Sequence, residues 1–243
     1  MKNLEELEKN WNELASRDPL WAILIWPEKY GNKWQLDEFF ANGEKEIREI
    51  IQHLKSSHQD LSFGKALDFG CGVGRLTQAL AHYFQNVTGV DVSPQMIELA
   101  SKYDRAGPER CAYAVNKNPN LSMFKDGIFD LVYSNITLQH MDKQLCKGYI
   151  REFLRVVSPK GIVIFQLPSH RSSTLQGQIM RFFPYSIYRK LKYPGLPVVP
   201  MNAIRREELV RFLKDIEGEV LHVEVDQGGG PHWVSFRYCI MKC

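Results

Sequence analysis

The sequence lacks several features that would assign it to a special class of protein. Its five cysteines are scattered and form no C-x-x-C pair, so neither a disulfide framework nor a zinc or other metal site is indicated. No run reaches the roughly 18 apolar residues that a helix needs to cross a bilayer. The first residues, MKNLEELEKNW, contain no apolar core like that of a signal peptide. The sequence therefore predicts a cytoplasmic protein with reduced thiols and no membrane partner.

A strong excess of one charge is also missing. The net charge is +3 over 243 residues, whereas a dedicated nucleic-acid binder usually carries a basic stripe and a more basic domain. The charge therefore argues against nucleic acid as a partner. The length suits one large α/β domain with additions, or two small domains. Nothing in the sequence indicates an oligomeric state.

Short apolar runs alternate with amphipathic stretches along most of the chain. The runs typical of strands are residues 65–70, 87–92, 112–115, 129–135, 161–168, 220–226 and 233–242. The stretches with helical spacing are residues 1–16, 35–57, 74–84, 94–103, 143–157 and 205–215. This alternation predicts βαβ units in a mostly parallel sheet, with ligands at the carboxyl ends of the strands. We expect residues 1–60 to form a helical lid and residues 61–243 an α/β domain, with a lid-like insertion at about 169–200.

A glycine-rich loop follows the first predicted strand. Gly70, Gly72 and Gly74 are spaced two apart, and Arg75 holds the position of the third glycine in a G-x-G-x-x-G dinucleotide fingerprint. Asp68, just before the loop, would oppose a pyrophosphate at a helix N-terminus. S-adenosylmethionine carries an ammonium and a sulfonium but no phosphate, so a carboxylate at this position would attract it instead of repelling it. Glycines would let the backbone approach its methionine part closely.

A second acid supports this interpretation. Asp91 ends the second predicted strand, 17 residues after Gly74, where its carboxylate can accept hydrogen bonds from both hydroxyls of a ribose. Folds that bind NAD share this feature, so it adds weight only in combination with the glycine loop.

Four segments in order and spacing resemble the core motifs of class I S-adenosylmethionine-dependent methyltransferases. They are LDFGCGVGRLT, VTGVDVSPQMIELA, FDLVYSNITLQHM and LRVVSPKGIVIF, and the resemblance covers about residues 63–168. It implies an α/β fold with a Rossmann-like, doubly wound, seven-stranded sheet that is mostly parallel, with the last strand antiparallel and helices ahead of the first strand.

The resemblance also implies a set of cofactor-binding residues. Asp68 would lie near the methionine ammonium, Gly70 and Gly72 against the methionine backbone, and Asp91 on the ribose. The remaining expected contacts are Gly74 in the same loop, Val92 and Met96 beside the adenine, and Asn135 in the fourth motif. Family members often carry an acid after the third strand that bonds the adenine amine. Here the segment YAVNKNPNLSMF has none, and Asn116 is the expected substitute.

The fourth motif bears on the acceptor. Enzymes that methylate amino groups of DNA, RNA or glutamine often carry Asp/Asn-Pro-Pro-Tyr/Phe there, whereas SNIT, residues 134–137, resembles the small-molecule subgroup. The predicted function is methyl transfer to oxygen or nitrogen of a small molecule, with S-adenosylhomocysteine as product. The alternatives are a cofactor-binding partner subunit without transfer activity, and an RNA-directed methyltransferase. Basic and aromatic residues interleave in 169–200. We rank three interpretations of this pattern: a lid over the substrate is preferred, a solvated surface comes second, and RNA contact comes third.

Methyl transfer depends mainly on positioning, and a general base is needed only when the acceptor arrives protonated. His140, shortly after the fourth predicted strand, is the first candidate, with local packing as an equal alternative. His232 in the loop QGGGPHW is the second candidate, although an ordinary hairpin loop also explains that run; His170 is a weaker third. The aromatic residues expected to close the pocket, unless each simply packs against the sheet, are Trp26, Tyr30 and Trp34.

Overall fold

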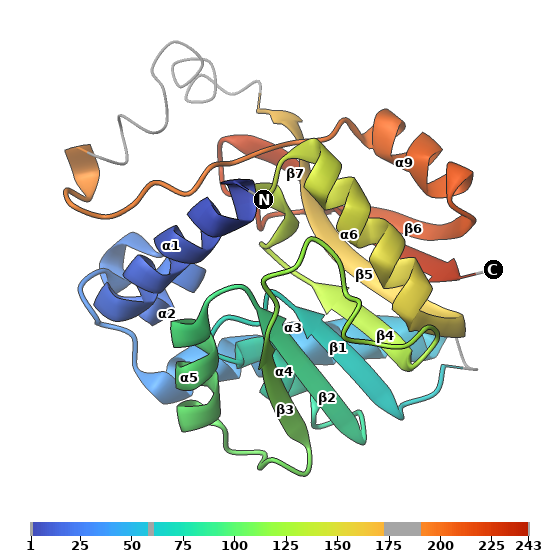
Figure 1. Ribbon diagram of the computed structural model, residues 1–243, viewed down its shortest axis with the longest axis horizontal. Coiled ribbons are helices and arrows are strands. Elements are labelled where there is room, and N and C mark those ends of the chain that lie inside the picture. Colours follow the sequence, from blue (N-terminus) through green and yellow to red (C-terminus); the bar gives the residue numbers. More distant parts are fainter. Residues whose placement is uncertain (1, 58–60, 173–190, 243) are drawn as a thin grey trace.

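The computed structural model describes residues 2–57, 61–172 and 191–242 (Figure 1). They contain a seven-stranded sheet in the order β3-β2-β1-β4-β5-β7-β6. The strands are β1 (Lys65–Phe69), β2 (Asn86–Asp91), β3 (Cys111–Val115), β4 (Phe129–Ser134), β5 (Val157–Arg171), β6 (Gly218–Asp226) and β7 (Trp233–Lys242). The strands from β3 to β5 pair in parallel, and β7 runs antiparallel to both β5 and β6. The predicted Rossmann-like sheet with an antiparallel last strand is confirmed.

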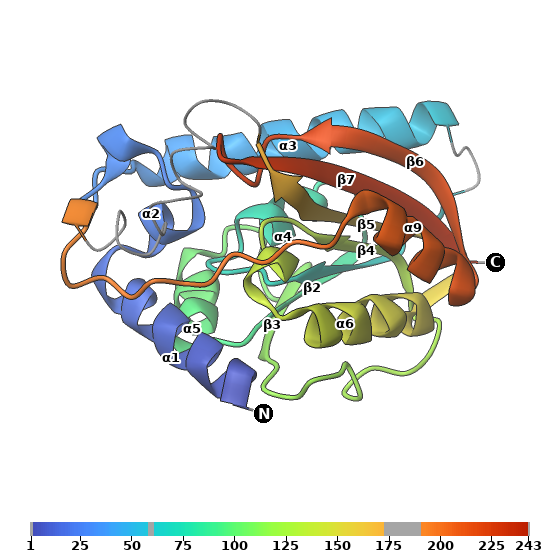
Figure 2. The ribbon, with the colours of Figure 1, turned by 90° about the horizontal axis from the view of Figure 1, so that it is seen from above.

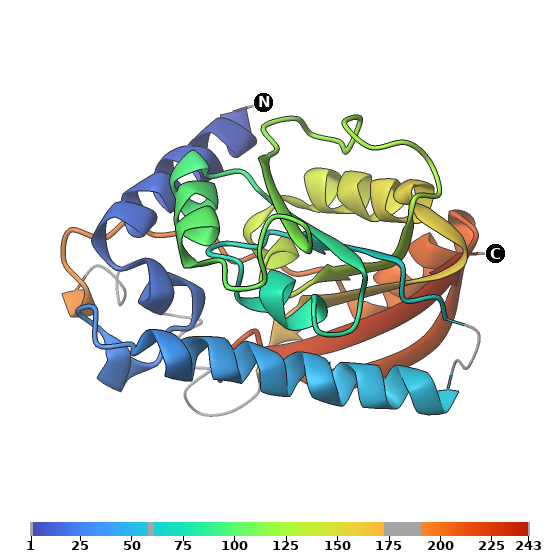
Figure 3. The same ribbon diagram turned by 90° about the horizontal axis from the view of Figure 1, so that it is seen from below.

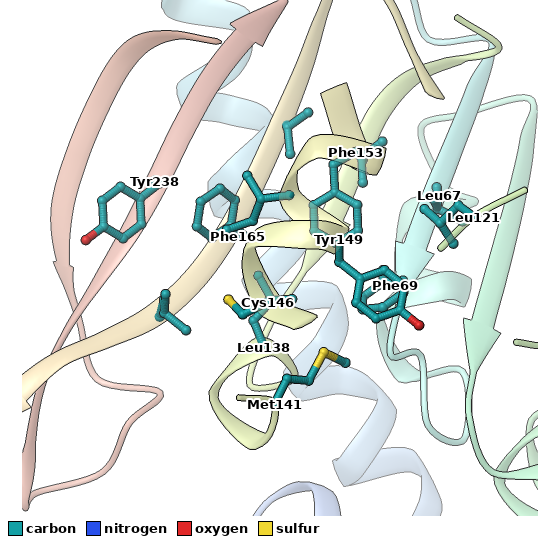
Figure 4. Close-up of a cluster of buried hydrophobic side chains, with 14 of the residues drawn as sticks. Leu67, Phe69, Leu121, Leu138, Met141, Cys146, Tyr149, Phe153, Phe165 and Tyr238 are labelled. Carbon is teal, nitrogen blue, oxygen red and sulfur yellow. The ribbon is translucent and has the colours of Figure 1, made fainter. Parts of the chain in front are cut away.

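Helices cover both faces of this sheet (Figure 2). On one face α3 (Leu36–Ser57) and α4 (Arg75–Leu80) pack against a cluster that includes Ile162 and Ile164 of β5. On the other face α6 (Lys143–Val156) and α9 (Arg206–Asp215) pack against a cluster that includes Val163 and Phe165. Successive side chains of β5 thus point to opposite faces of the sheet, as the pleat of a strand requires. Figure 4 shows part of the second cluster, where the rings of Phe69 and Tyr149 lie with centroids 4.5 Å apart.

Local capping explains where the helices next to the strand ends begin. The Ser93 side chain accepts from the Met96 N–H at 3.1 Å at the start of α5 (Pro94–Tyr103), and Asp142 accepts from the Leu145 N–H at 2.8 Å at the start of α6. Gly74 precedes α4 with φ +81°, and a Cβ there would lie 2.8 Å from the Tyr113 hydroxyl oxygen. Only glycine fits this turn without strain. These caps fix the direction in which each helix leaves the sheet.

Two predicted elements differ from the structure by more than two residues at one end or at both. Helix α4 ends at Leu80, before the predicted limit of 84, because a turn leads the chain into β2. Strand β5 begins at Val157 instead of 161, and it extends past the predicted 168 to Arg171, which pairs with Trp233 of β7. The beginning of the predicted insertion at 169–200 therefore belongs to the sheet. Residues 173–190 lie outside the described part of the chain.

The N-terminal segment lies over the carboxyl ends of the strands. It consists of α1 (Lys2–Arg17), α2 (Pro19–Ile23) and the 3-10 helix η1 (Pro27–Lys29), and Figure 3 shows α1 beside α5. The Ser93 hydroxyl donates to Asn12 Oδ1 at 2.6 Å, which joins α1 to the start of α5. Tyr193 packs against Trp21 and Tyr30, with ring centroids 4.6 and 4.9 Å away. The end of the predicted insertion therefore packs against the N-terminal segment.

Candidate active site

A small cavity lies where β1, β2 and β4 end. Its volume is about 80 Å³. The floor comes from the strand ends and the loops after them: Phe69, Gly70, Gly72, Val90, Asp91, Val92, Asn116, Asn135 and Thr137. The roof comes from the N-terminal segment: Leu4, Leu7, Trp11 and Ile23. We call this space the first cavity; the predicted glycine loop and the predicted ribose acid share it.

Asp91 anchors the glycine loop to β2. Its Oδ2 accepts from the Gly72 N–H at 3.0 Å, and its Oδ1 accepts from the Ser93 N–H at 2.9 Å. Burial raises the pKa of the carboxyl, while the hydrogen bonds from these two N–H groups act to lower it. An ionised carboxylate has about four acceptor sites. Both oxygens therefore retain acceptor capacity toward a ligand in the first cavity.

Two of the loop glycines make room for close contacts. Gly70 and Gly72 have φ angles of +77° and +53°. A Cβ on Gly70 would lie 2.2 Å from the Thr137 side chain, and a Cβ on Gly72 would lie 2.6 Å from Ile23 Cδ1. Gly74 does not line the first cavity. The first two glycines thus form its wall, whereas the third serves the turn into α4.

Besides Gly74, two predicted cofactor residues do not line the first cavity. Asp68 is 1% exposed, and its carboxylate accepts from the Thr77 hydroxyl at 2.7 Å. Burial raises the pKa of Asp68 from 3.8 to about 7. Met96 is fully buried in a cluster with Trp21 and Trp34. Asp68 sits behind the glycine loop, and Met96 faces the N-terminal helices because the buried side of α5 points that way.

Two asparagines complete the floor. The Asn116 side chain donates to the Asn120 carbonyl at 3.1 Å and accepts from the Asn118 N–H at 3.2 Å. Asn135 donates to Glu46 Oε1 at 2.6 Å, and its own Oδ1 is buried without a hydrogen-bond partner among the described residues. Such an oxygen suits a donor brought by a ligand, because burial without a partner is costly. Glu46 was missed by sequence reasoning, since it lies on α3, far from Asn135 in the chain.

A second, larger cavity adjoins the first, with a volume of about 390 Å³. Most of its lining is apolar and comes from the N-terminal segment and later loops: Leu14, Ala22, Leu24, Ile25, Trp26, Val199, Met201, Pro231 and Trp233. The polar side chains in its wall are Gln139, His140, Gln227 and His232. Both cavities share Trp11, Ile23, Ile136 and His140. These four residues therefore form the boundary between the two cavities, and His140 has contact with both.

The hydrogen bond to Pro200 orients the His140 ring. His140 ends the 3-10 helix η2 (Leu138–His140), and its Nδ1 lies 2.8 Å from the Pro200 carbonyl oxygen. A carbonyl only accepts, so we assign the proton of the neutral ring to Nδ1, which leaves Nε2 as the basic nitrogen. Nε2 lies 3.4 Å from Gln139 Nε2. The His140 ring is thus held in the lining that the two cavities share.

The other predicted candidates occupy different places. His232 lines the second cavity, and its pKa is lowered by burial and then by the charge of Arg171. His170 is exposed and lines neither cavity. Trp26, 40% exposed, also lines the second cavity. Tyr30 and Trp34 pack in the aromatic cluster of the N-terminal segment instead.

Ile136 was not identified from the sequence. It has φ +57° and lines both cavities. A β-branched residue seldom adopts a left-handed backbone, and such strain persists only where the surroundings impose it. The strain turns the chain from β4 toward η2, which carries His140.

The described helices contain no stretch that is both long and apolar enough to span a membrane.

Comparison with known proteins supports the identity of the core. Residues 67–165 match a family described as "Methyltransferase domain". The chain is 42% identical over 101 residues to 2-methyl-6-phytyl-1,4-hydroquinone methyltransferase of Synechocystis sp.; the aligned segment is 40% of this chain and 30% of that protein. It is 30% identical over 145 residues to ubiquinone biosynthesis O-methyltransferase of Methylococcus capsulatus; this segment is 57% of this chain and 59% of that protein. The chain spans between 30% and 44% of the length of the first curated relatives it matches.

The fold also matches solved structures. Magnesium protoporphyrin IX methyltransferase from Synechocystis, crystallised with bound SAH, superposes with a TM-score of 0.67 over 98% of both chains. The sequence identity is 15%, so this likeness concerns the fold.

Proposed function

We propose that this chain is an S-adenosylmethionine-dependent methyltransferase that transfers a methyl group to a hydroxyl oxygen of an apolar small molecule, since residues 67–165 match a methyltransferase family and the fold matches that of an enzyme crystallised with SAH. One observation carries the proposal. His140 lines both the glycine-walled first cavity and the apolar second cavity. In the proposed reaction the first cavity would hold the cofactor, the second would hold the acceptor, and His140 would act as the base between them.

The residues of the first cavity suit S-adenosylmethionine, which when bound would supply an electrophilic methyl group on a sulfonium. Asp91 would accept from the ribose hydroxyls, and the unpartnered Asn135 Oδ1 would accept from the ammonium. Gly70 and Gly72 leave space for close backbone contact. Val92 and Asn116 line the same cavity and would border the adenine.

Cofactor binding requires the N-terminal segment to move. The first cavity holds about 80 Å³, whereas pockets for drug-sized ligands measure about 300–1,000 Å³. Ile23 and α1 form its roof, and their side chains occupy the space above the glycine loop. We therefore propose that α1 and α2 act as a lid that opens to admit the cofactor and closes to exclude water.

His140 would accept the proton of the acceptor hydroxyl at Nε2. S-adenosylmethionine held in the first cavity would supply the methyl group to the deprotonated oxygen, with the neutral thioether S-adenosylhomocysteine as the leaving group. The Pro200 carbonyl, 2.8 Å from Nδ1, holds the ring orientation and stabilises the charge that the ring gains. The apolar wall excludes water, and the reaction relies chiefly on alignment.

The lining of the second cavity supports a ring-containing, largely apolar acceptor. Trp11, Trp26 and Trp233 contribute flat aromatic surfaces, and no acidic or lysine side chain lines this cavity among the described residues. Relatives named for hydroquinone and ubiquinone biosynthesis favour the same class. The expected partner is a small molecule.

The test is methyl transfer by His140→Gln, with His170→Gln as the matched control. Labelled S-adenosylmethionine would be supplied with a panel of alkylated hydroquinones and catechols. General-base catalysis is worth about 10²–10⁴-fold, so His140→Gln should lower kcat by that factor, while the affinity for S-adenosylhomocysteine and the activity of His170→Gln stay unchanged. A wild-type kcat in His140→Gln would overturn the role of His140. Cofactor-product binding without turnover of any acceptor would favour a partner subunit.

A further inference from the structure

Gln139 carries a polar group into the apolar wall of the second cavity. The residue is 3% exposed and lines that cavity. Its Oε1 is buried without a hydrogen-bond partner among the described residues. Its Nε2 lies 3.4 Å from His140 Nε2. The amide is therefore buried, incompletely bonded and adjacent to the proposed base.

The hydrogen bond that ties Gln139 to the segment around Asn202 uses its backbone and not its side chain. The backbone carbonyl of Gln139, which any residue supplies, accepts from the Asn202 N–H at 2.7 Å. The side-chain oxygen in contrast loses its water without gaining a partner, which costs about 1–3 kcal/mol. An apolar residue of similar size would avoid that cost. A bound molecule that supplies the missing hydrogen bond explains why the amide is tolerated.

We propose that Gln139 is a specificity-determining residue that recognises a second oxygen of the acceptor, on the ring atom next to the hydroxyl that is methylated. This inference rests on the proposed function. When the acceptor hydroxyl donates to His140 Nε2, it takes the place that the Gln139 amide N–H occupies in the structure. The amide then lies beside the neighbouring ring position. Its Oε1 accepts from a hydroxyl there, or its Nε2 donates to a carbonyl.

The chemical class of acceptor is thus a ring with two adjacent oxygens, as in a catechol or a hydroxyquinone. A site built to hydrogen-bond a substrate oxygen strongly rejects the analogue that lacks it, because its own buried polar group stays unpaired. A monohydric phenol would leave Gln139 Oε1 unpartnered. It should therefore be a poorer acceptor than the matching catechol.

The experiment compares 4-hexylcatechol with 4-hexylphenol, which differ only in the second oxygen. Wild type, Gln139→Leu and Gln52→Leu are assayed; the last variant makes the same change at an exposed position of α3 that lines neither cavity. Wild type and Gln52→Leu should favour the catechol in kcat/KM by about tenfold or more, and Gln139→Leu should lose that preference mainly through KM. The pH profile of kcat for the phenol, which reports the base, should be the same in Gln139→Leu as in wild type.

Calorimetry of both probes against the complex with S-adenosylhomocysteine separates this inference from the proposed function. A Gln139-dependent preference for the catechol in binding, without any methyl transfer, would support the inference and contradict the proposed function. Transfer with no effect of Gln139→Leu on the catechol-to-phenol ratio would overturn the inference alone. Equal losses for both probes would also overturn it, since they indicate general positioning. Failure of both probes to bind would overturn the assigned acceptor class.

Discussion

Replacing Asp91 tests the cofactor site most sharply, because this carboxylate has two tasks. Toward the protein it accepts from the Gly72 and Ser93 N–H groups at 3.0 and 2.9 Å. Toward the cofactor it would accept from two ribose hydroxyls, and each charge-assisted bond is worth about 1.5–3 kcal/mol. Since 1.4 kcal/mol is about a factor of ten, Asp91→Ala should weaken binding of S-adenosylhomocysteine at least tenfold, and by up to about 10⁴-fold if both bonds count fully.

Asp91→Asn should fall between wild type and Asp91→Ala. The asparagine keeps one acceptor oxygen, but its NH₂ group cannot accept from either backbone N–H. Isothermal calorimetry measures the affinities, and circular dichroism confirms that each variant folds. Asp37→Ala is the control, because that acid is highly exposed and lines neither cavity. A folded Asp91→Ala with an affinity within about twofold of wild type would refute the assignment.

Three further predictions follow from burial and the proposed lid. The pKa of Asp68 is raised from 3.8 to about 7, so the native state holds a proton that the unfolded chain releases, and wild type should lose stability as the pH rises from about 4 to about 7. Asp68→Asn should therefore gain in Tm relative to wild type over this window; a Tm difference independent of pH would contradict the burial effect. Trp21, 0% exposed, should cost about 3–5 kcal/mol of unfolding free energy when replaced by alanine, as urea denaturation can measure; a loss below about 1 kcal/mol would show that the N-terminal cluster contributes little. S-adenosylhomocysteine should slow hydrogen exchange in residues 2–34 as well as in the glycine loop, and protection confined to that loop would argue against a lid.

The sheet, and the positions of the glycines and acid that line the first cavity, could be predicted from the sequence because their signals are local. Gly70 and Gly72 follow a strand directly, and Asp91 ends the next one, so their positions at the carboxyl ends follow from βαβ topology. His140 was also found in this way, since it follows β4 closely. Each of these residues is placed by elements within a short distance along the chain.

The parts that were missed depend on contacts between distant segments. Ile23 and Trp11 form the roof over the glycine loop, and Glu46 on α3 binds Asn135; no sequence pattern indicates such pairs. Met96 was expected at the adenine, but the aromatic cluster of the N-terminal segment buries it. Strand β5 extends past its apolar run to Arg171, because backbone pairing with β7 needs no apolar side chain.

The central claim is that the glycine-walled cavity binds S-adenosylmethionine rather than a dinucleotide. A calorimetric titration of the purified chain with S-adenosylhomocysteine, and separately with NAD, tests it directly. The predicted result is binding of S-adenosylhomocysteine in the micromolar range and no heat change attributable to NAD. Tight binding of NAD without any response to S-adenosylhomocysteine would contradict it.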